Sequence, residues 1–290
     1  MLGPLLLMAA MAAGAEACPP EPAAGLTARA APFGGVIAPG AADAEEAAAA
    51  GMVAQQAARR FLGLEAPLYL IAPESSAAPH PGGGCTFVFP WRFPIRDAGR
   101  PPLPSHVLPH EIGHALFIRF LVPRTGEVEY GGGAPDWLDE MAAIAFEDAA
   151  GVRMRRSEAR RHAERGALIP LARLLAMPHP EWSARRLAAD VAGGSRTDQP
   201  ASAESPAFYA TVRALLDFLI ARTRDERVVR RLAEEVRAGA PLDRWLVAQA
   251  APGAAAKGLS LLDAQIVAFV LTTPAYDARR LGSGADASVR

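Results

Sequence analysis

The pentapeptide His110-Glu111-Ile112-Gly113-His114 is the part of the chain whose residue types and spacing could carry chemistry. On a helix, His110 and His114 stand about one turn apart on the same face, because an α-helix has 3.6 residues per turn. Two neutral imidazoles there can bind one divalent metal ion, and Glu111 can take a proton from a water at that metal. The pattern therefore predicts a zinc site with a glutamate base. The alternative is a pair of helix histidines held by hydrogen bonds.

The residues around this pentapeptide favour a helix that is mostly buried. Pro109 suits the first turn, where its missing N–H costs least, and Pro123 marks the end. Burying two histidines and a glutamate without partners is costly, so an apolar setting favours the metal site. The apolar positions are Ile112, Ala115, Leu116, Ile118, Phe120 and Leu121.

A catalytic zinc usually takes three protein ligands and leaves one position for water. The metzincin pattern, with a third histidine six residues after the second, is excluded because that position is Phe120 and the expected glycine is Phe117. The third ligand must then come from elsewhere in the chain, and a carboxylate on a following helix is the remaining option.

Three carboxylates near Trp137 are the candidates for the third ligand. Glu140 shares a helical face with Trp137 and other apolar residues, so its carboxylate points into surroundings where it needs a partner. Asp136 is better explained as a helix-start residue, and Asp139 as an exposed residue or one that supports a ligand. We expect Glu140 to be the third ligand, with the two aspartates as competitors.

The two motifs together resemble the gluzincin branch of zinc metallopeptidases, the thermolysin-like group of peptidase clan MA. The first is His110-Glu111-x-x-His114, and the second, Trp137-Leu138-Asp139-Glu140-x-Ala142, is similar to the family's Trp-Leu-x-Glu-Gly-x-Ala. The resemblance extends diffusely over residues 43–275. It implies a zincin-like two-lobed fold, one bound zinc ion, and a peptide or protein substrate.

The resemblance also assigns roles to single residues. His110, His114 and Glu140 would be the metal ligands and Glu111 the general base. Tyr209, in a run similar to the family's tyrosine-containing helix, would help to stabilise the oxyanion; a packed helix aromatic is the alternative. Two other histidines, His162 and His179, are candidates for the oxyanion role, although a surface position is the expectation for both. His106 is expected near the site or on the surface, not as a ligand.

One position departs from the family pattern. Met141 stands where the family often has glycine. Its larger side chain could narrow the substrate pocket or merely repack the helix, without affecting metal binding.

Composition indicates an α+β, mostly helical protein. Apolar residues make up 51% of the 290 residues, much of this alanine, and aromatic residues only 7%. The formal net charge of −1 gives no electrostatic case for binding nucleic acid or an anionic membrane. Arginines between residues 153 and 165 are expected on a solvated helix with pairs at i,i+4, and a basic binding patch is the alternative. The sequence does not predict an oligomeric state.

The first residues resemble an export signal. Residues 1–17 contain an apolar run too short to span a bilayer, followed by small residues, which predicts a secreted or periplasmic protein. Cys18 raises the alternative of a lipoprotein anchored there.

Pairing of Cys18 with Cys85, the only other cysteine, is also possible in an oxidising compartment, with two free thiols as the alternative. No later segment has 18 uninterrupted apolar residues, so we expect no membrane span.

The expected organisation follows from these elements. Residues 18–42 are an extended lead-in, 43–123 an N-terminal lobe ending in the metal helix, 124–278 a helical lobe carrying the third ligand, and 279–290 a flexible tail. Short strands are expected at 67–72 and 85–89, the second offering an edge for an extended substrate. The function that this predicts is an exported zinc-dependent metallopeptidase. The alternatives are a non-catalytic zincin-fold binding or scaffold protein and a zinc hydrolase of non-peptide amides.

Overall fold

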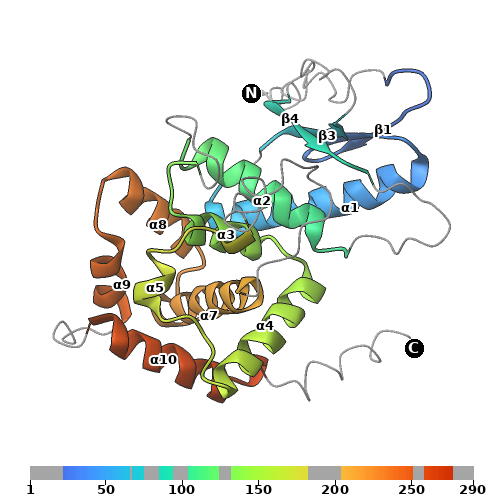
Figure 1. The fold of residues 1–290 in the computed structure, drawn as a ribbon. Helices are drawn as coiled ribbons and strands as arrows, with labels where there is room; N and C mark the ends of the chain where they lie inside the picture. The colour runs from blue at the N-terminus through green and yellow to red at the C-terminus, as the bar shows by residue number, and fades with distance from the viewer. Residues whose placement is uncertain are drawn as a thin grey trace, which may run out of the picture. The chain divides into compact units, whose positions relative to one another are not determined.

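The computed structural model describes residues 22–65, 67–74, 85–93, 104–123, 132–181, 204–250 and 258–276. The chain divides into two compact units, Met1–Met52 with Ala66–Pro102 and Val53–Glu65 with Leu103–Arg290. The predicted export signal, Cys18 and the C-terminal tail lie outside the described residues. The prediction of a mostly helical α+β protein is confirmed (Figure 1).

The first unit contains a four-stranded mixed sheet in the order β1-β2-β3-β4. β1 (Thr27–Ala31) pairs antiparallel with β2 (Gly34–Ala38), and β3 (Tyr69–Pro73) is parallel to both β2 and β4 (Phe87–Trp91). The strands predicted at 67–72 and 85–89 are formed, each shifted by about two residues. The hairpin of β1 and β2 falls where the sequence predicted only an extended lead-in.

The core of this unit is built around a buried tyrosine. The ring of Tyr69 lies between Phe33 and Phe87, with centroid distances of 4.9 and 5.5 Å, and its hydroxyl donates to the carbonyl of Gly51 at 3.0 Å. Gly51 is in helix α1 (Ala41–Ala57), whose first residues belong to this unit. Cys85, two residues before β4, is disulfide-bonded, as the sequence analysis allowed.

The second unit is helical throughout its described residues. α7 lies at its centre and packs against α3, α4, α8, α9 and α10, with nearly every residue from Phe208 to Leu219 buried. No helix among the described residues is long and apolar enough to cross a bilayer. The elements are η1 (Ala58–Leu62, a π-helix), α2 (Val107–Phe120), α3 (Asp136–Ala145), α4 (Ala149–Glu164), α5 (Leu171–Leu174), α7 (Ser205–Thr223), α8 (Val228–Arg237), α9 (Leu242–Ala250), α10 (Gly258–Thr272) and η2 (Pro274–Tyr276).

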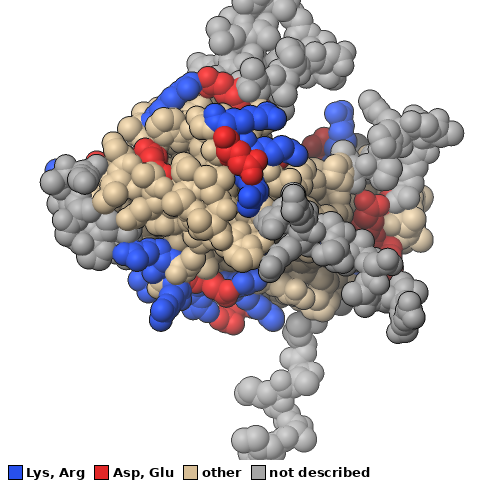
Figure 2. Space-filling model, turned by 90° about the horizontal axis from the view of Figure 1, so that it is seen from below, with Lys and Arg blue, Asp and Glu red and all other residues tan. Residues whose placement is uncertain are grey.

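Charged side chains are mixed in sign on the surface. Figure 2 shows arginines and acidic residues lying next to one another around a broad uncharged area, not gathered in one basic field. The expected i,i+4 pairing on α4 is present between Arg160 and Glu164 at 2.8 Å, and α8 has a similar pair. Exposed pairs of this kind contribute only a few tenths of a kcal/mol each.

A glycine inside the HExxH motif lets α2 and α3 approach closely. A Cβ added to Gly113 would lie 2.9 Å from the Cα of Ala143 and 3.0 Å from the ring of Phe146. The two helix backbones are therefore nearly in contact at this point. This close approach brings the histidines of α2 within reach of the carboxylates of α3.

We predict that Gly113→Ala destabilises the protein by about 1–3 kcal/mol, because the added methyl group must push the helices apart. Helix propensity alone predicts the opposite sign, a gain of about 1 kcal/mol. The free energy of unfolding from urea denaturation measures the difference. Ser260→Ala, on the exposed face of α10, is the control and should change stability by less than about 0.5 kcal/mol.

Candidate metal centre

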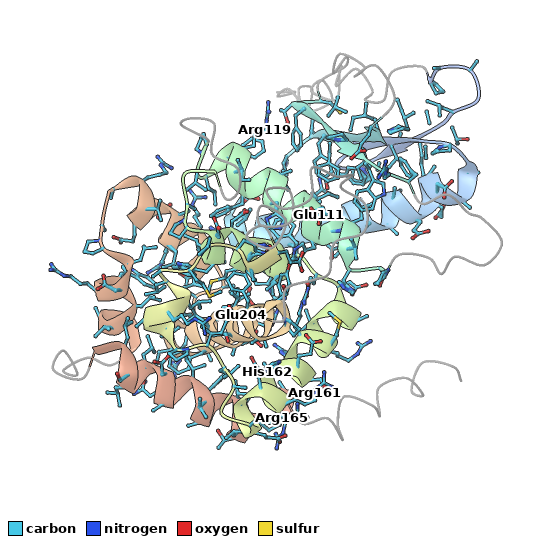
Figure 3. The ribbon with its side chains drawn as sticks, viewed as in Figure 1. Glu111, Arg119, Arg161, His162, Arg165 and Glu204 are labelled. Atoms are coloured by element: carbon cyan, nitrogen blue, oxygen red, sulfur yellow. The ribbon has the colours of Figure 1, made fainter. Side chains whose placement is uncertain are left out.

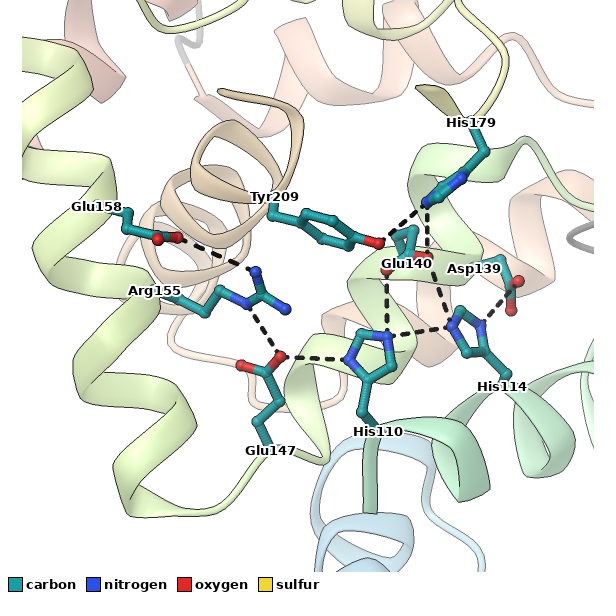
Figure 4. A network of polar contacts seen from close by, with 9 residues as sticks. All are labelled: His110, His114, Asp139, Glu140, Glu147, Arg155, Glu158, His179 and Tyr209. Atoms are coloured by element: carbon teal, nitrogen blue, oxygen red, sulfur yellow. Dashed lines mark hydrogen bonds and ion pairs between the residues drawn. The ribbon is translucent and has the colours of Figure 1, made fainter. Parts of the chain in front are cut away.

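Three predicted ligands, His110, His114 and Glu140, meet at the crossing of α2 and α3 (Figure 4). The two histidines lie one turn apart on α2, and their Nε2 atoms are 3.2 Å from each other. Nε2 of His110 is 3.4 Å from Oε2 of Glu140, and Nε2 of His114 is 3.5 Å from Oε1. The cluster is buried, and the side chain of Glu140 is only 1% exposed.

The spacing of these atoms matches what a metal ion requires. With metal–ligand bonds of about 2.0–2.1 Å, the ligand atoms of a tetrahedral site lie about 3.3 Å from one another. The two Nε2 atoms are 3.2 Å apart and lie 3.4 and 3.5 Å from different oxygens of Glu140, and one ligand atom from each of the three residues can be chosen with all separations within 4.8 Å. Two imidazole nitrogens and one carboxylate also form a donor set that suits a catalytic zinc. His110, His114 and Glu140 could therefore hold a metal ion without rearrangement of the helices.

The second nitrogen of each imidazole faces another buried carboxylate. Nδ1 of His110 is 3.2 Å from Oε1 of Glu147, and Nδ1 of His114 is 2.9 Å from Oδ2 of Asp139. Metal-binding histidines usually have such a partner, which fixes the ring and leaves the other nitrogen free to bind the metal. Asp139 thus supports a ligand, as the sequence analysis allowed. The role of Glu147 was missed.

The carboxylates govern the protonation of the two histidines. Burial alone would lower the pKa of His110, but hydrogen bonds to Glu140 and Glu147 outweigh it and raise the pKa to about 9. The pKa of His114 is likewise lowered by burial and raised more strongly by Asp139 and Glu140, to well above its usual value. For Glu140, burial raises the pKa and the histidines lower it to well below normal. Without a metal, the cluster is therefore held together as ion pairs.

A chain of contacts leads from His110 to α4. Oε1 of Glu147 also accepts a hydrogen bond from Nε of Arg155 at 3.0 Å. The guanidinium of Arg155 lies over the ring of Tyr209, 4.3 Å from its centroid, and within 4.0 Å of Glu158. Arg155 therefore restrains both the carboxylate behind His110 and the tyrosine beside it.

His179 is the site residue whose position differs most from the expectation. A surface position was expected, but the residue is buried, with its Nε2 atom 3.0 Å from Oε1 of Glu140 and 3.3 Å from the hydroxyl of Tyr209. Its backbone N–H donates to Oδ2 of Asp136 at 2.6 Å. Asp136, expected only to start α3, thus also anchors the segment that delivers His179.

Glu111 lies on the same helix as the histidines but is exposed, unlike Glu140. The negative charge of Glu111 interacts electrostatically with the hydroxyl of Tyr209. Burial is the main cause that raises the pKa of Tyr209 far above its usual value, and Glu140 and Glu111 add to it. The phenol therefore stays protonated, with one carboxylate buried behind the site and another open to solvent.

The remaining histidine candidates lie apart from the cluster. His162 lies near the C-terminal end of α4, remote from Glu111 (Figure 3). His106 precedes α2 at its N-cap, and its Cβ lies beside Gly151 at the start of α4. Neither residue belongs to the group that could hold a metal.

Comparisons with known proteins add no assignment: no protein-family model matches the chain, and no match is found among curated proteins or solved structures. The interpretation of this site depends on its residues and geometry.

We predict that Asp139→Asn lowers metal affinity about 10–100-fold, since the ring of His114 loses the carboxylate that orients it. Competition with a chromogenic chelator measures the dissociation constant. Asp243→Asn, on the exposed part of α9, is the matched control and should bind metal as the wild type does. Equal affinity of the Asp139 variant would contradict the supporting role.

Metal binding is expected to release protons at neutral pH. The pKa values of His110 and His114 are raised in the metal-free protein, so both rings are protonated on both nitrogens at pH 7, and each must lose one proton to bind a metal. About two protons should be released per ion at pH 7, and affinity should rise with pH from neutral to beyond the pKa of His110 at about 9, until both rings are neutral. Calorimetry in buffers of different ionisation enthalpy counts the protons. Release of none at pH 7 would show that the rings are neutral.

Proposed function

We propose that this protein is a zinc-dependent metallopeptidase in which His110, His114 and Glu140 bind the zinc ion and Glu111 is the general base. The observation that carries the proposal is the convergence of the two Nε2 atoms and the carboxylate of Glu140, with contacts of 3.2–3.5 Å between them and a further carboxylate behind each imidazole. A packing role for two buried histidines does not require a third donor at the same spacing. The intact glutamate between them favours an enzyme over a passive metal site.

The bound zinc would polarise the scissile carbonyl and make the attacking water more acidic. Glu111 would accept that water's proton; its position on the same helix as both histidine ligands and its exposure to solvent support this role. It would then return the proton to the leaving amine. Glu140 cannot exchange roles with Glu111, since it is fully buried and held by three histidines.

Tyr209 and His179 are the candidates for stabilising the negative charge that develops on the carbonyl oxygen. The raised pKa of Tyr209 keeps its hydroxyl protonated, so that it can donate a hydrogen bond. Its ring centroid is 6.4 Å from that of His110, and the hydroxyl is 3.3 Å from Nε2 of His179. We favour Tyr209 as the donor and His179 as the residue that orients the tyrosine hydroxyl and Glu140.

The resemblance to gluzincins supports the same proposal. It depends on the two motifs, and the contacts of His110 and His114 with Glu140 are in keeping with it. Met141, the departure from the family pattern, is fully buried in the core of the second unit. Its burial favours the view that the larger side chain changes the packing of α3 and does not narrow the substrate pocket. A peptide or protein substrate and export from the cytoplasm remain parts of the proposal that derive from the motifs and from residues 1–17.

The deciding experiment combines metal content with cleavage of a broad peptide library. We expect about one zinc per chain in the wild type, and in Glu111→Gln the same zinc content with activity reduced about 10²–10⁴-fold, because only the base is lost. Glu140→Ala should lose the metal as well. Glu164→Gln, an exposed glutamate on α4, is the control for general effects and should keep full activity.

Other outcomes would assign the protein to another class. Zinc bound without turnover of any peptide, but with hydrolysis of small amides, would favour a non-peptide hydrolase. Zinc bound without any turnover would favour a binding or scaffold protein. Absence of metal from purified protein, with none taken up on titration, would overturn the proposal.

A further inference from the structure

A second polar site lies on the other side of α4. A cavity of about 690 Å³ is lined by residues of η1, α3, α4, α7, α10 and η2, all of which belong to the second unit. This volume is within the range of small-molecule binding sites. The wall includes the aromatic residues Phe61, Phe269 and Tyr276, together with several small aliphatic side chains. None of the three proposed metal ligands lines the cavity.

The charged residues of the lining are unbalanced. They contain four arginines and two carboxylates, an excess of two positive charges. Arg60 is paired with Glu226, and Glu147 is paired with Arg155, and neither partner lines the cavity. These two pairs neutralise one positive and one negative charge of the lining, so the excess of two positive charges remains. The lining residues concerned are Arg60, Arg153, Arg156, Arg213, Glu147 and Asp217.

The excess is concentrated around Asp217. Oδ2 of Asp217 accepts from Nε of Arg156 and from the hydroxyl of Tyr276, both at 2.7 Å, and Oδ1 accepts from Arg156 at 3.3 Å and from Nη2 of Arg213. Burial raises the pKa of Asp217, but Arg213 and Arg156 lower it by more than burial raises it. The net pKa is below the usual value, so the carboxylate is ionised. One carboxylate thus serves two guanidinium groups and has no acceptor capacity left.

Arg213 has more donors than this arrangement satisfies. The residue is 6% exposed, and a guanidinium has five N–H donors. Among the described residues only Asp217 accepts from it, and its buried Nε has no acceptor. Arg153, on the exposed side of the same lining, has no acceptor among the described residues either. Both arginines line the cavity, so an acceptor bound there could take hydrogen bonds from their unused Nη groups.

We propose that this cavity binds a small oxyanion-bearing molecule, a carboxylate or a phosphate, through Arg156 and Arg213 beside the ring of Tyr276. Asp217 occupies the Nε and Nη2 atoms of Arg156 on one side, so the ligand would accept from the remaining Nη donors of Arg156 and Arg213, whose planar geometry suits both anions. The aromatic wall favours a ligand whose body is apolar. The site does not depend on the proposed peptidase activity.

Isothermal titration calorimetry with inorganic phosphate and with benzoate, at constant ionic strength, tests the proposal on the full chain. We expect saturable binding of at least one probe at one site, with a dissociation constant of about 1 mM or below. Tighter binding of benzoate would identify a carboxylate ligand with an apolar body, and tighter binding of phosphate a phosphate ligand. Absence of saturable binding with both probes would overturn the proposal.

Variants distinguish the cavity from general anion binding. Arg213→Gln should weaken binding about 10-fold or more, because a charge-assisted hydrogen bond is lost. Arg156→Lys keeps the charge beside Asp217 and loses the fork, so it should fold and also weaken binding, which decides the case if the Arg213 variant fails to fold. Arg165→Gln, at the end of α4 and outside the lining, is the control and should bind as the wild type does. Equal binding by Arg156→Lys and the control would refute the site.

Discussion

The close packing of α2 against α3 is the constraint on which the candidate metal centre depends. His114 and Glu140 are 26 residues apart in sequence, yet their side chains meet at 3.5 Å because Gly113 lets the helix backbones nearly touch. Histidine and glutamate side chains on two helices can meet at one point only if the helix backbones are this close together. A wider crossing would leave a gap that a metal ion with bonds of about 2 Å could not bridge.

The second feature of the centre is that its charges compensate one another. Asp139, Glu140 and Glu147 are buried, and isolated charges at such depth would be strongly destabilising. Protonated His110 and His114, together with Arg155 beside Glu147, balance the three carboxylates in the metal-free protein, and a divalent cation with Arg155 would balance them when the protons leave. The same carboxylates that raise the pKa values of the imidazoles also orient them. The charges can therefore be compensated in both states, and protons would compete with a metal ion for the two imidazoles.

Helix α4 connects this centre with the arginine-lined cavity. Two adjacent residues point to opposite sides of the helix: Arg155 contacts Glu147 and Tyr209, whereas Arg156 contacts Asp217. Glu147 also lines the cavity, so it is shared by both clusters. Buried ionic contacts on both faces of one helix specify how α4 packs against α7, since any other register would leave charges without partners.

The sequence by itself determined the features that depend on local periodicity. A spacing of four predicted that His110 and His114 share one face of α2, and the apolar pattern around Trp137 predicted that Glu140 points inward. Only the tertiary structure decided that Glu147 and His179 join the site, and that residues 27–38 form a hairpin. Helical periodicity reports which face of an element is buried, whereas the polar groups that meet there depend on how distant elements pack. His179 lies in the Pro-rich segment after α5, and β1 and β2 are rich in alanine and glycine. Neither stretch has a hydrophobic period from which its partners could be predicted.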